Sequence, residues 1–373
     1  MQSEFALILV TSLACGLAAG FLLHRSDFCV TGMFRDFFLF RDLSMLRVLV
    51  LMILVSMALV HGAQALGLIA YYPFPLLGAM SLTNVMGGAL FGVGMVLAGG
   101  CVVGTLYKMG SGSVLSAVAF FGLLAGSALY GEFHPAWAGL TKQLAVFGPA
   151  ITLPQAFGVD PRVLIIPTLL AGMWLVVRWA RRGQLVMPAH AEGYIQPWIS
   201  ALALAAIGLA SYIVVGMPLG ITTSYAKLGS MVEAWFAPDH VASLAYFQGT
   251  GLNYIPPFGE HPITGGAGPE LDAVAAIQYP LVAGIVLGAF ISALLLRELR
   301  LHYRMPVRQY VSVLIGGILV GMAARMVPAC NVWHLWGGVP ILAGQSLLYV
   351  VGLVPGTWLG SLILSKYVVK GPS

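Results

Sequence analysis

The chain has 373 residues and a net charge of +5, and 59% of its residues are hydrophobic while only 8% are charged. Soluble globular domains carry about 25% charged residues, so this composition excludes a water-soluble protein. The apolar residues fall in blocks of about 20, the length that crosses a hydrocarbon core, and the basic residues gather in the short loops between them. We therefore expect a polytopic, all-α membrane protein, a transporter or channel, whose partner is the lipid bilayer and not a nucleic acid.

The first half of the chain, residues 1–180, begins with an uncleaved apolar span at about 5–23. Residues 26–40 are too mixed in polarity to span a membrane and too aromatic for a solvated loop, so they predict a short re-entrant helix that carries Cys29. Residues 132–160 are marginally apolar, and we expect an interfacial helix there. The other spans of this half are predicted at 46–70, 83–100, 112–130 and 161–179.

The second half, residues 197–373, follows a connecting loop at 181–196. The stretch 233–272 is rich in Pro, Gly, Asn and His, which predicts a loop outside the hydrocarbon. The spans of this half are predicted at 197–216, 273–296, 309–327 and 341–364.

One sequence pattern occurs in both halves. Residues 87–92 (Gly-Gly-Ala-Leu-Phe-Gly) precede Cys101, residues 316–321 (Gly-Gly-Ile-Leu-Val-Gly) precede Cys330, and in both cases the cysteine follows the first glycine by fourteen positions. In the second half, Pro218–Ser224 stands at the position that corresponds to the re-entrant helix of the first half. Repeats built from Gly-broken segments point to a transporter site at the repeat interface. We therefore expect one integral membrane domain, 1–373, with two inverted repeats whose re-entrant or broken half-helices meet at the membrane midplane.

The arginines fix the expected orientation. They concentrate in the segments 25–47, 178–182 and 297–308, and cytoplasmic loops of membrane proteins carry an excess of Lys and Arg. These segments are therefore predicted to face the cytoplasm, with the acidic N-terminus outside and Lys366 and Lys370 inside.

The cysteines are the candidate site residues. Cys29, Cys101 and Cys330 each lie at a Gly- or Pro-bearing break in an apolar segment, whereas Cys15 lies inside a continuous apolar helix and is interpreted as a packing residue. A half-helix that starts at such a break points unpaired N–H groups and its positive dipole end at the cavity, which favours an anion. A single buried cysteine is more often a small hydrophobe, but three in matching contexts favour a site. The neighbouring Gly100 and Asn331 are assigned to the same substrate-binding site.

Thiol chemistry narrows the choice of anion. A thiol is a weak, polarisable donor that suits a soft sulfur atom, whereas hard sulfate or phosphate oxygens are usually met by Arg, Lys and backbone amides. The thiols are expected to stay protonated, because a thiolate about 4 Å from one substrate charge would cost roughly 4 kcal/mol at an effective dielectric of 20. No CxxC pair or metal-ligand cluster is present, so we expect no metal, no cofactor and no disulfide framework.

Four charged residues accompany the cysteines. Arg325 lies within the apolar block that precedes Cys330, and charges inside a membrane are costly and usually functional; we interpret it as substrate-binding, with snorkelling or a structural ion pair as the alternative. Arg35 and Asp36 are interpreted as a charged latch under the re-entrant helix or as an ordinary cytoplasmic anchor. Lys108 would screen substrate charge at an exit or lie at the interface.

Two motifs resemble those of the YeeE/YedE family of bacterial sulfur-transport membrane proteins, and among them the thiosulfate-uptake permeases. They are His24–Asp36 (HRSDFCVTGMFRD) and Leu97–Thr105 (LAGGCVVGT), and Gly220–Thr222 extends the likeness into the second half. The resemblance implies an hourglass of inverted repeats in the inner membrane, with three cysteines that pass thiosulfate inward by S–H···S contacts. It also implies a small TusA-like sulfur-carrier protein on the cytoplasmic side.

The segment around Cys330, in the second half of the chain, departs from the family pattern. The family usually has Ala-Gly-Gly-Cys there, whereas this chain has the bulkier Val327–Cys330 (Val-Pro-Ala-Cys), which leaves another sulfur or selenium compound open as substrate. A membrane thiol-disulfide oxidoreductase is the alternative from another class, and it would need a cysteine pair with Cα atoms within about 7 Å. A third alternative is a membrane anchor for a cytoplasmic sulfurtransferase. The chain has no GxxxxGK[ST] loop for direct coupling to ATP.

Overall fold

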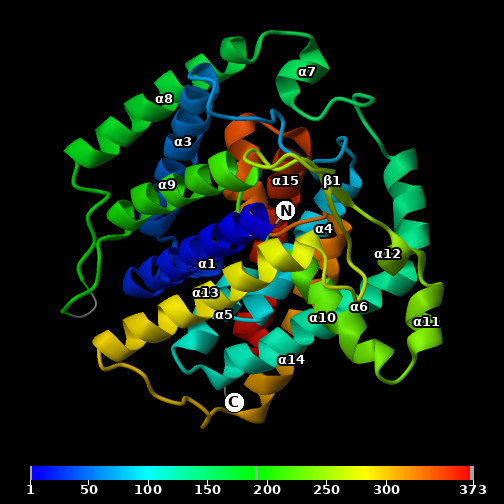
Figure 1. The fold of residues 1–373 in the computed structure, drawn as a ribbon. Coiled ribbons are helices and arrows are strands. Elements are labelled where there is room, and N and C mark those ends of the chain that lie inside the picture. The colour runs from blue at the N-terminus through cyan, green and yellow to red at the C-terminus, as the bar shows by residue number, and fades with distance from the viewer. Residues whose placement is uncertain (1, 190–191, 370–373) are drawn as a thin grey trace.

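The computed structural model describes residues 2–189 and 192–369 (Figure 1). Within these ranges, nine helical segments are long and apolar enough to cross a membrane, so the predicted multi-pass, all-α class is confirmed. Residues 190–191 of the predicted connecting loop and Lys370 lie outside the described residues. The long helices are α1 (Gln2–Arg25), α3 (Ser44–Ala65), α4 (Thr83–Leu97), α6 (Val114–Gln143), α8 (Pro161–Arg181), α9 (Pro197–Val215), α13 (Ala273–Leu295), α14 (Val307–Met326) and α15 (Gly344–Ile363).

The long helices form two layers. In the first layer α8, α3, α9, α1 and α13 lie side by side in that order, and in the second layer the order is α15, α4, α14 and α6 (Figure 1). Glycines allow the close approach within the second layer: a Cβ on Gly88 of α4 would lie 2.3 Å from the Tyr349 carbonyl oxygen, and one on Gly352 of α15 would lie 1.9 Å from that of Val85. Small residues that let helix backbones meet are typical of membrane helix packing.

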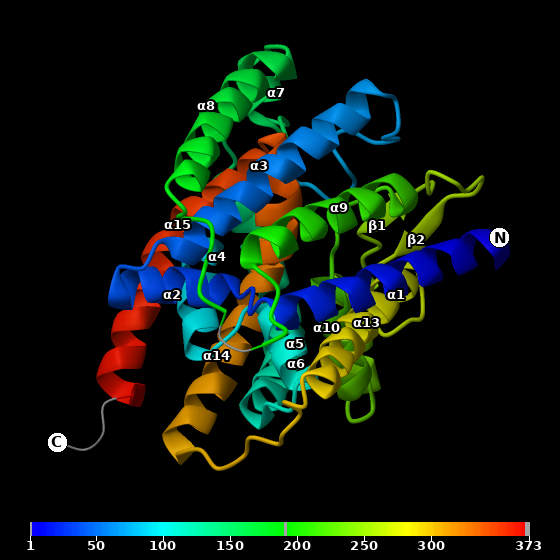
Figure 2. The same cartoon turned by 90° about the vertical axis from the view of Figure 1, so that its left-hand side faces the viewer.

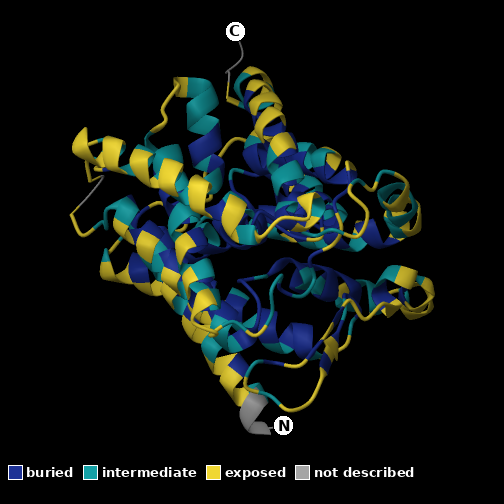
Figure 3. Cartoon of the chain, turned by 90° about the horizontal axis from the view of Figure 1, so that it is seen from above, coloured by how far each residue is buried: buried dark blue, intermediate teal, exposed yellow. Residues whose placement is uncertain are grey.

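Four half-helices lie between the two layers and contact helices of both. They are α2 (Val30–Phe40), α5 (Val102–Gly110), α10 (Thr222–Ala234) and the π-helix η1 (Val332–Gly338). Buried residues gather in this central region, and exposed residues form the periphery (Figure 3). The outer face of α8 exposes Leu170 and Trp174, at 68% and 63%, which is the surface that a helix in contact with lipid presents.

One predicted span is longer than expected, and one predicted loop contains short elements of secondary structure. The span predicted at 112–130 is α6, which continues to Gln143 through Pro135, so the interfacial helix expected within 132–160 is reduced to the five-residue α7 (Leu153–Phe157). The predicted loop at 233–272 is folded: it holds α11 (Pro238–Ser243), α12 (Ala245–Gln248) and an antiparallel hairpin of β1 (Leu252–Tyr254) and β2 (Ile263–Gly265). Lys227 of α10, fully buried, donates to Asp272 at 2.8 Å and to the Gly268 carbonyl oxygen at 2.8 Å, and so holds this segment against the helices.

The hairpin and the N-terminus lie at one side of the molecule, and the C-terminus lies at the opposite side (Figure 2). Helix α1 runs away from the hairpin side, so its end and the start of α9 lie toward the other side of the molecule (Figure 2). The chain closes with the 3₁₀-helix η2 (Val339–Ile341) before α15 and the π-helix η3 (Leu364–Val369) after it.

Candidate functional site

The site begins at a cavity of about 350 Å³ beside the end of α1. Its lining includes Cys29, Arg35, Asp36, Lys108 and part of the segment 187–197, and we call it the basic-loop cavity. Cys29 is the N-cap of α2, where its Sγ accepts a hydrogen bond from the Gly32 backbone N–H at 3.4 Å. The predicted re-entrant helix with Cys29 at its start is therefore confirmed as a helix in this position.

Three of the four predicted charged residues lie on the wall of this cavity. Arg35 and Asp36 form an ion pair with each other, with Nε and Oδ1 2.8 Å apart. The Lys108 Nζ donates to the Gly99 carbonyl oxygen at 2.7 Å, so it holds the break that precedes Cys101. Across the cavity, burial and the hydrogen bond to Glu298 raise the pKa of Tyr194 to about 12, so that its phenol is a neutral donor.

The second cysteine borders a much smaller space, which we call the constriction. Cys101 is the N-cap of α5, and a space of only about 20 Å³ lies between it and Asn331, with Phe28 and Trp336 in the wall. A space of this size holds about one water molecule. A small sulfur oxyanion is larger than water, so this space is too small to hold one.

Cys29 and Cys101 face the same point. A Cβ built on Gly104, one turn into α5, would lie 3.6 Å from the Cys101 Sγ and 3.8 Å from the Cys29 Sγ. Gly100 is buried just before Cys101, where a Cβ would lie 3.1 Å from the backbone of Gly104, so this position is tightly packed. Each thiol therefore stands at the start of a half-helix, and both border the space above Gly104.

The third cysteine belongs to a buried and well-braced segment. Cys330 is 1% exposed and directly precedes Asn331, the N-cap of η1. The Asn331 Oδ1 accepts from the Tyr349 hydroxyl at 2.6 Å. The His334 Nε2 lies 3.0 Å from the Val327 carbonyl oxygen, which can only accept, so Nε2 carries the proton and Nδ1 accepts from the Ser346 hydroxyl at 2.9 Å.

The site ends at a second cavity, of about 340 Å³, which we call the hairpin cavity. Its lining includes Arg325, Tyr246, His134 and residues of the β1–β2 hairpin. Arg325 is 5% exposed. Its Nη1 donates to the Thr223 hydroxyl at 3.1 Å and to the Tyr246 hydroxyl at 3.4 Å, and its Nη2 donates to the Thr222 hydroxyl.

Sequence reasoning missed three side chains of this region. The Tyr225 hydroxyl is buried without a hydrogen-bond partner among the described residues, and Tyr225 belongs to the same buried core as Cys101 and Cys330. Thr222 and Tyr246 hold Arg325. Pro218–Ser224 was recognised as the counterpart of the first half-helix, and extending that correspondence by one residue would have reached Tyr225; the pairing of Tyr246 with Arg325 has no sequence signal.

Comparisons with known proteins identify the family of the chain. The family model described as sulphur transport matches residues 25–359. The thiosulfate transporter TsuA of Spirochaeta thermophila is 30% identical over 366 aligned residues, 95% of this chain and 99% of that protein. The thiosulfate transporter TsuA of Escherichia coli K12 is 26% identical over 374, 96% of this chain and 95% of that protein. The probable transporter YedE of the same organism is 29% identical over 171, 45% of this chain and 40% of its own. Because the family model covers most of the chain, including all three site cysteines, the chain belongs to the YeeE/YedE family of sulphur-transport membrane proteins.

Proposed function

We propose that this protein is a permease of the bacterial inner membrane that imports thiosulfate, or a closely related small sulfur-containing anion, along Cys29, Cys101 and Cys330. The observation that carries the proposal is the position of the three thiols, each at or next to the start of a half-helix and all in one buried core. Cys29 lies on the wall of the basic-loop cavity, and Pro328, two residues before Cys330, lies on the wall of the hairpin cavity. The names of the two full-length relatives support thiosulfate as the substrate.

Neutral thiols would guide the anion by exchanging hydrogen bonds. Each S–H donates a hydrogen bond to the terminal sulfur of thiosulfate. The next thiol then donates to the same sulfur atom as the hydrogen bond from the previous thiol breaks. The transfer from Cys101 to Cys29 would take place across Gly104, where both sulfur atoms face one point. Because the constriction holds about 20 Å³, side chains around it must move apart during each passage.

We propose that the basic-loop cavity opens to the cytoplasm and the hairpin cavity to the outside. The positions of the arginine segments support this orientation. Lys108 and the Arg35–Asp36 pair would then act at the exit, where Lys108 screens the anion's charge. A small TusA-like sulfur-carrier protein would receive the sulfur compound on this side.

We also propose that residues 1–180 and 197–373 are inverted repeats. The helix packing supports this, because the contact of α1 with α13 is matched by that of α9 with α3, and the contact of α4 with α15 by that of α14 with α6. These pairs match if α1 corresponds to α9, α3 to α13, α4 to α14 and α6 to α15. The half-helices follow the same rule, since α2 contacts α15 and α10 contacts α6.

Uptake into proteoliposomes that contain only this protein tests the proposal. Labelled thiosulfate should accumulate and labelled sulfate should not; the absence of thiosulfate uptake would contradict the proposal and favour an anchoring subunit. Competition with selenium and other sulfur oxyanions defines the substrate range. All four cysteines are free thiols in the described chain, so non-reducing mass spectrometry after turnover should find no disulfide, whereas a Cys29–Cys101 disulfide that forms with turnover would favour the oxidoreductase.

A further inference from the structure

Arg325 is a buried cation that has no counter-ion among the described residues. In the part of the chain that the structure describes, no carboxylate lies within ion-pair distance of its guanidinium, and the Nε atom is buried with no hydrogen-bond partner. Removing a charge from water is expensive unless the charge is paired. The three hydroxyls around Arg325 do not neutralise it, so the site lacks one negative charge.

The hydroxyls are arranged to donate. Thr222, Thr223 and Tyr246 each accept a hydrogen bond from the guanidinium, so each still has its own O–H to give to another acceptor. Thr222 and Thr223 are the first two residues of the thirteen-residue helix α10, whose N-terminal dipole also favours an anion. Together these groups form a set of hard donors around one cation.

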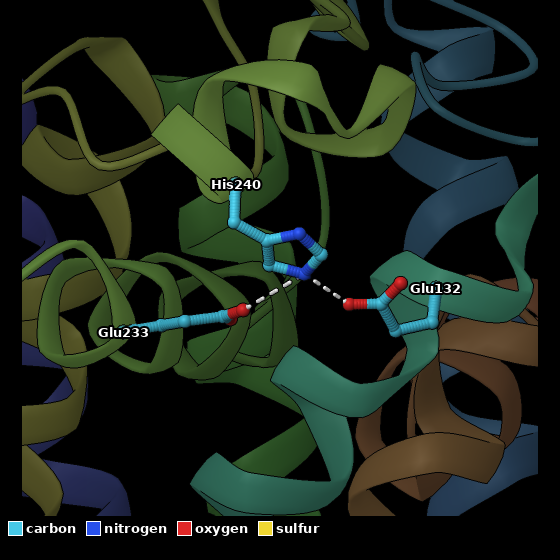
Figure 4. A group of neighbouring side chains, drawn as sticks. All are labelled: Glu132, Glu233 and His240. Carbon is cyan, nitrogen blue, oxygen red and sulfur yellow. Dashed lines mark hydrogen bonds and ion pairs between the residues drawn. The ribbon is translucent and has the colours of Figure 1, made fainter. Parts of the chain in front are cut away.

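The carboxylates around the hairpin cavity are already paired: Asp272 accepts from the Gly266 backbone N–H at 2.9 Å and from Lys227 at 2.8 Å. None of the described residues that line the hairpin cavity is acidic, and His134 is there with its Nδ1 3.2 Å from the Tyr130 hydroxyl. An ion-pair cluster on the outer side of the cavity wall links α11 to α6 and α10 (Figure 4). His240 of α11 lies between two carboxylates, with its Nε2 2.5 Å from Glu132 of α6 and 3.5 Å from Glu233 of α10. This contact holds α11, and α12 with Tyr246 follows directly in the chain.

We propose that Arg325, Thr222, Thr223 and Tyr246 form an oxyanion site that binds the SO₃ end of the incoming anion and also binds sulfate. Selection for the soft sulfur atom would then occur only afterwards, at the thiols. That the anion arrives at this site first rests on the proposed function. The binding of sulfate at the site does not depend on it. Sulfate would therefore be a ligand of the hairpin cavity and an inhibitor of uptake, although the constriction does not pass it.

Binding of labelled sulfate to the purified full chain in detergent tests the site without any transport step. Sulfate should bind and be displaced by thiosulfate, Arg325→Gln should lose at least tenfold in affinity, and Arg325→Lys should keep part of it. Cys101→Ala should bind sulfate like the wild type, as should Arg162→Gln, which removes an exposed arginine of α8. Tyr246→Phe removes one hydroxyl from a half-buried ring, so the protein should stay folded with a loss of roughly three- to tenfold in affinity.

Three results would overturn the site: wild-type protein that binds no sulfate, a monodisperse Arg325→Gln variant that binds it normally, or an equal loss in Cys101→Ala. Should Arg325→Gln fail to fold, unchanged binding by Tyr246→Phe would overturn the assigned donor set. The two proposals fail separately. Sulfate binding without thiosulfate uptake refutes the permease and leaves the site, whereas thiosulfate uptake that sulfate does not inhibit refutes the site and leaves the permease.

Discussion

Replacing Gly104 by alanine places one methyl group between two of the proposed transport residues. The added Cβ would lie 3.6 Å from the Cys101 Sγ and 3.8 Å from the Cys29 Sγ. Both distances are ordinary van der Waals contacts, so the substitution fits this structure without a clash. Alanine also suits a helix interior better than glycine, by about 0.5–1 kcal/mol, so folding should be unimpaired.

Transport should nevertheless fall. The methyl group occupies the point that both thiols face, and a sulfur atom that moves from one thiol to the other must share that space. Extra methylenes in a filled site cost about 1–3 kcal/mol. If the whole cost applies while the anion passes, uptake should fall roughly 5- to 150-fold.

The assay compares initial rates of thiosulfate uptake by proteoliposomes and thermal unfolding of the same preparations. Gly62→Ala is the matched control, because a Cβ on Gly62 of α3 would have no neighbour within 4 Å; this variant should keep the wild-type rate. Normal uptake by a stable Gly104→Ala variant would refute a path that runs between Cys101 and Cys29.

Other changes test the fold and the orientation. Gly88→Ala would bring a methyl group within 2.3 Å of the Tyr349 carbonyl oxygen, so the melting temperature should drop with a loss of about 1–3 kcal/mol; an unchanged value would mean that α4 and α15 are less close. His334→Ala removes two buried hydrogen bonds and should destabilise the protein by about 1–2 kcal/mol from these bonds alone, which thermal unfolding measures and an unchanged unfolding temperature would contradict. Phosphatase fusions at 183–189 should be inactive, and an impermeant reagent should reach an N-terminal tag; the reverse pattern would invert the proposed topology.

Much of the fold was predictable because lipid imposes simple rules on a sequence. Spans were found from apolar length, and the half-helices at Cys29 and Cys101 from glycines and polarity at the breaks. The extension of α6 through Pro135 was not found, because proline normally ends a helix while neighbouring helices can satisfy the freed backbone groups in a membrane protein.

The site was predictable only in part. The thiols are marked by local motifs, and Arg325 by its position in an apolar block. Its partners come from α10 and from α12, which lie about 100 and 80 positions away in the chain, and a single sequence holds no record of such pairings. The folded segment 233–272 was read as a loop for the same reason, since its order depends on the contacts of Lys227 with Asp272 and Gly268.

The central claim is that the three thiols carry the anion, and the uptake of labelled thiosulfate by four single variants in proteoliposomes tests it most directly. Cys29→Ala, Cys101→Ala and Cys330→Ala should each abolish or greatly reduce uptake while the protein remains folded. Cys15→Ala should transport normally, because Cys15 is a buried residue inside α1. Wild-type rates in any of the first three variants would contradict the relay.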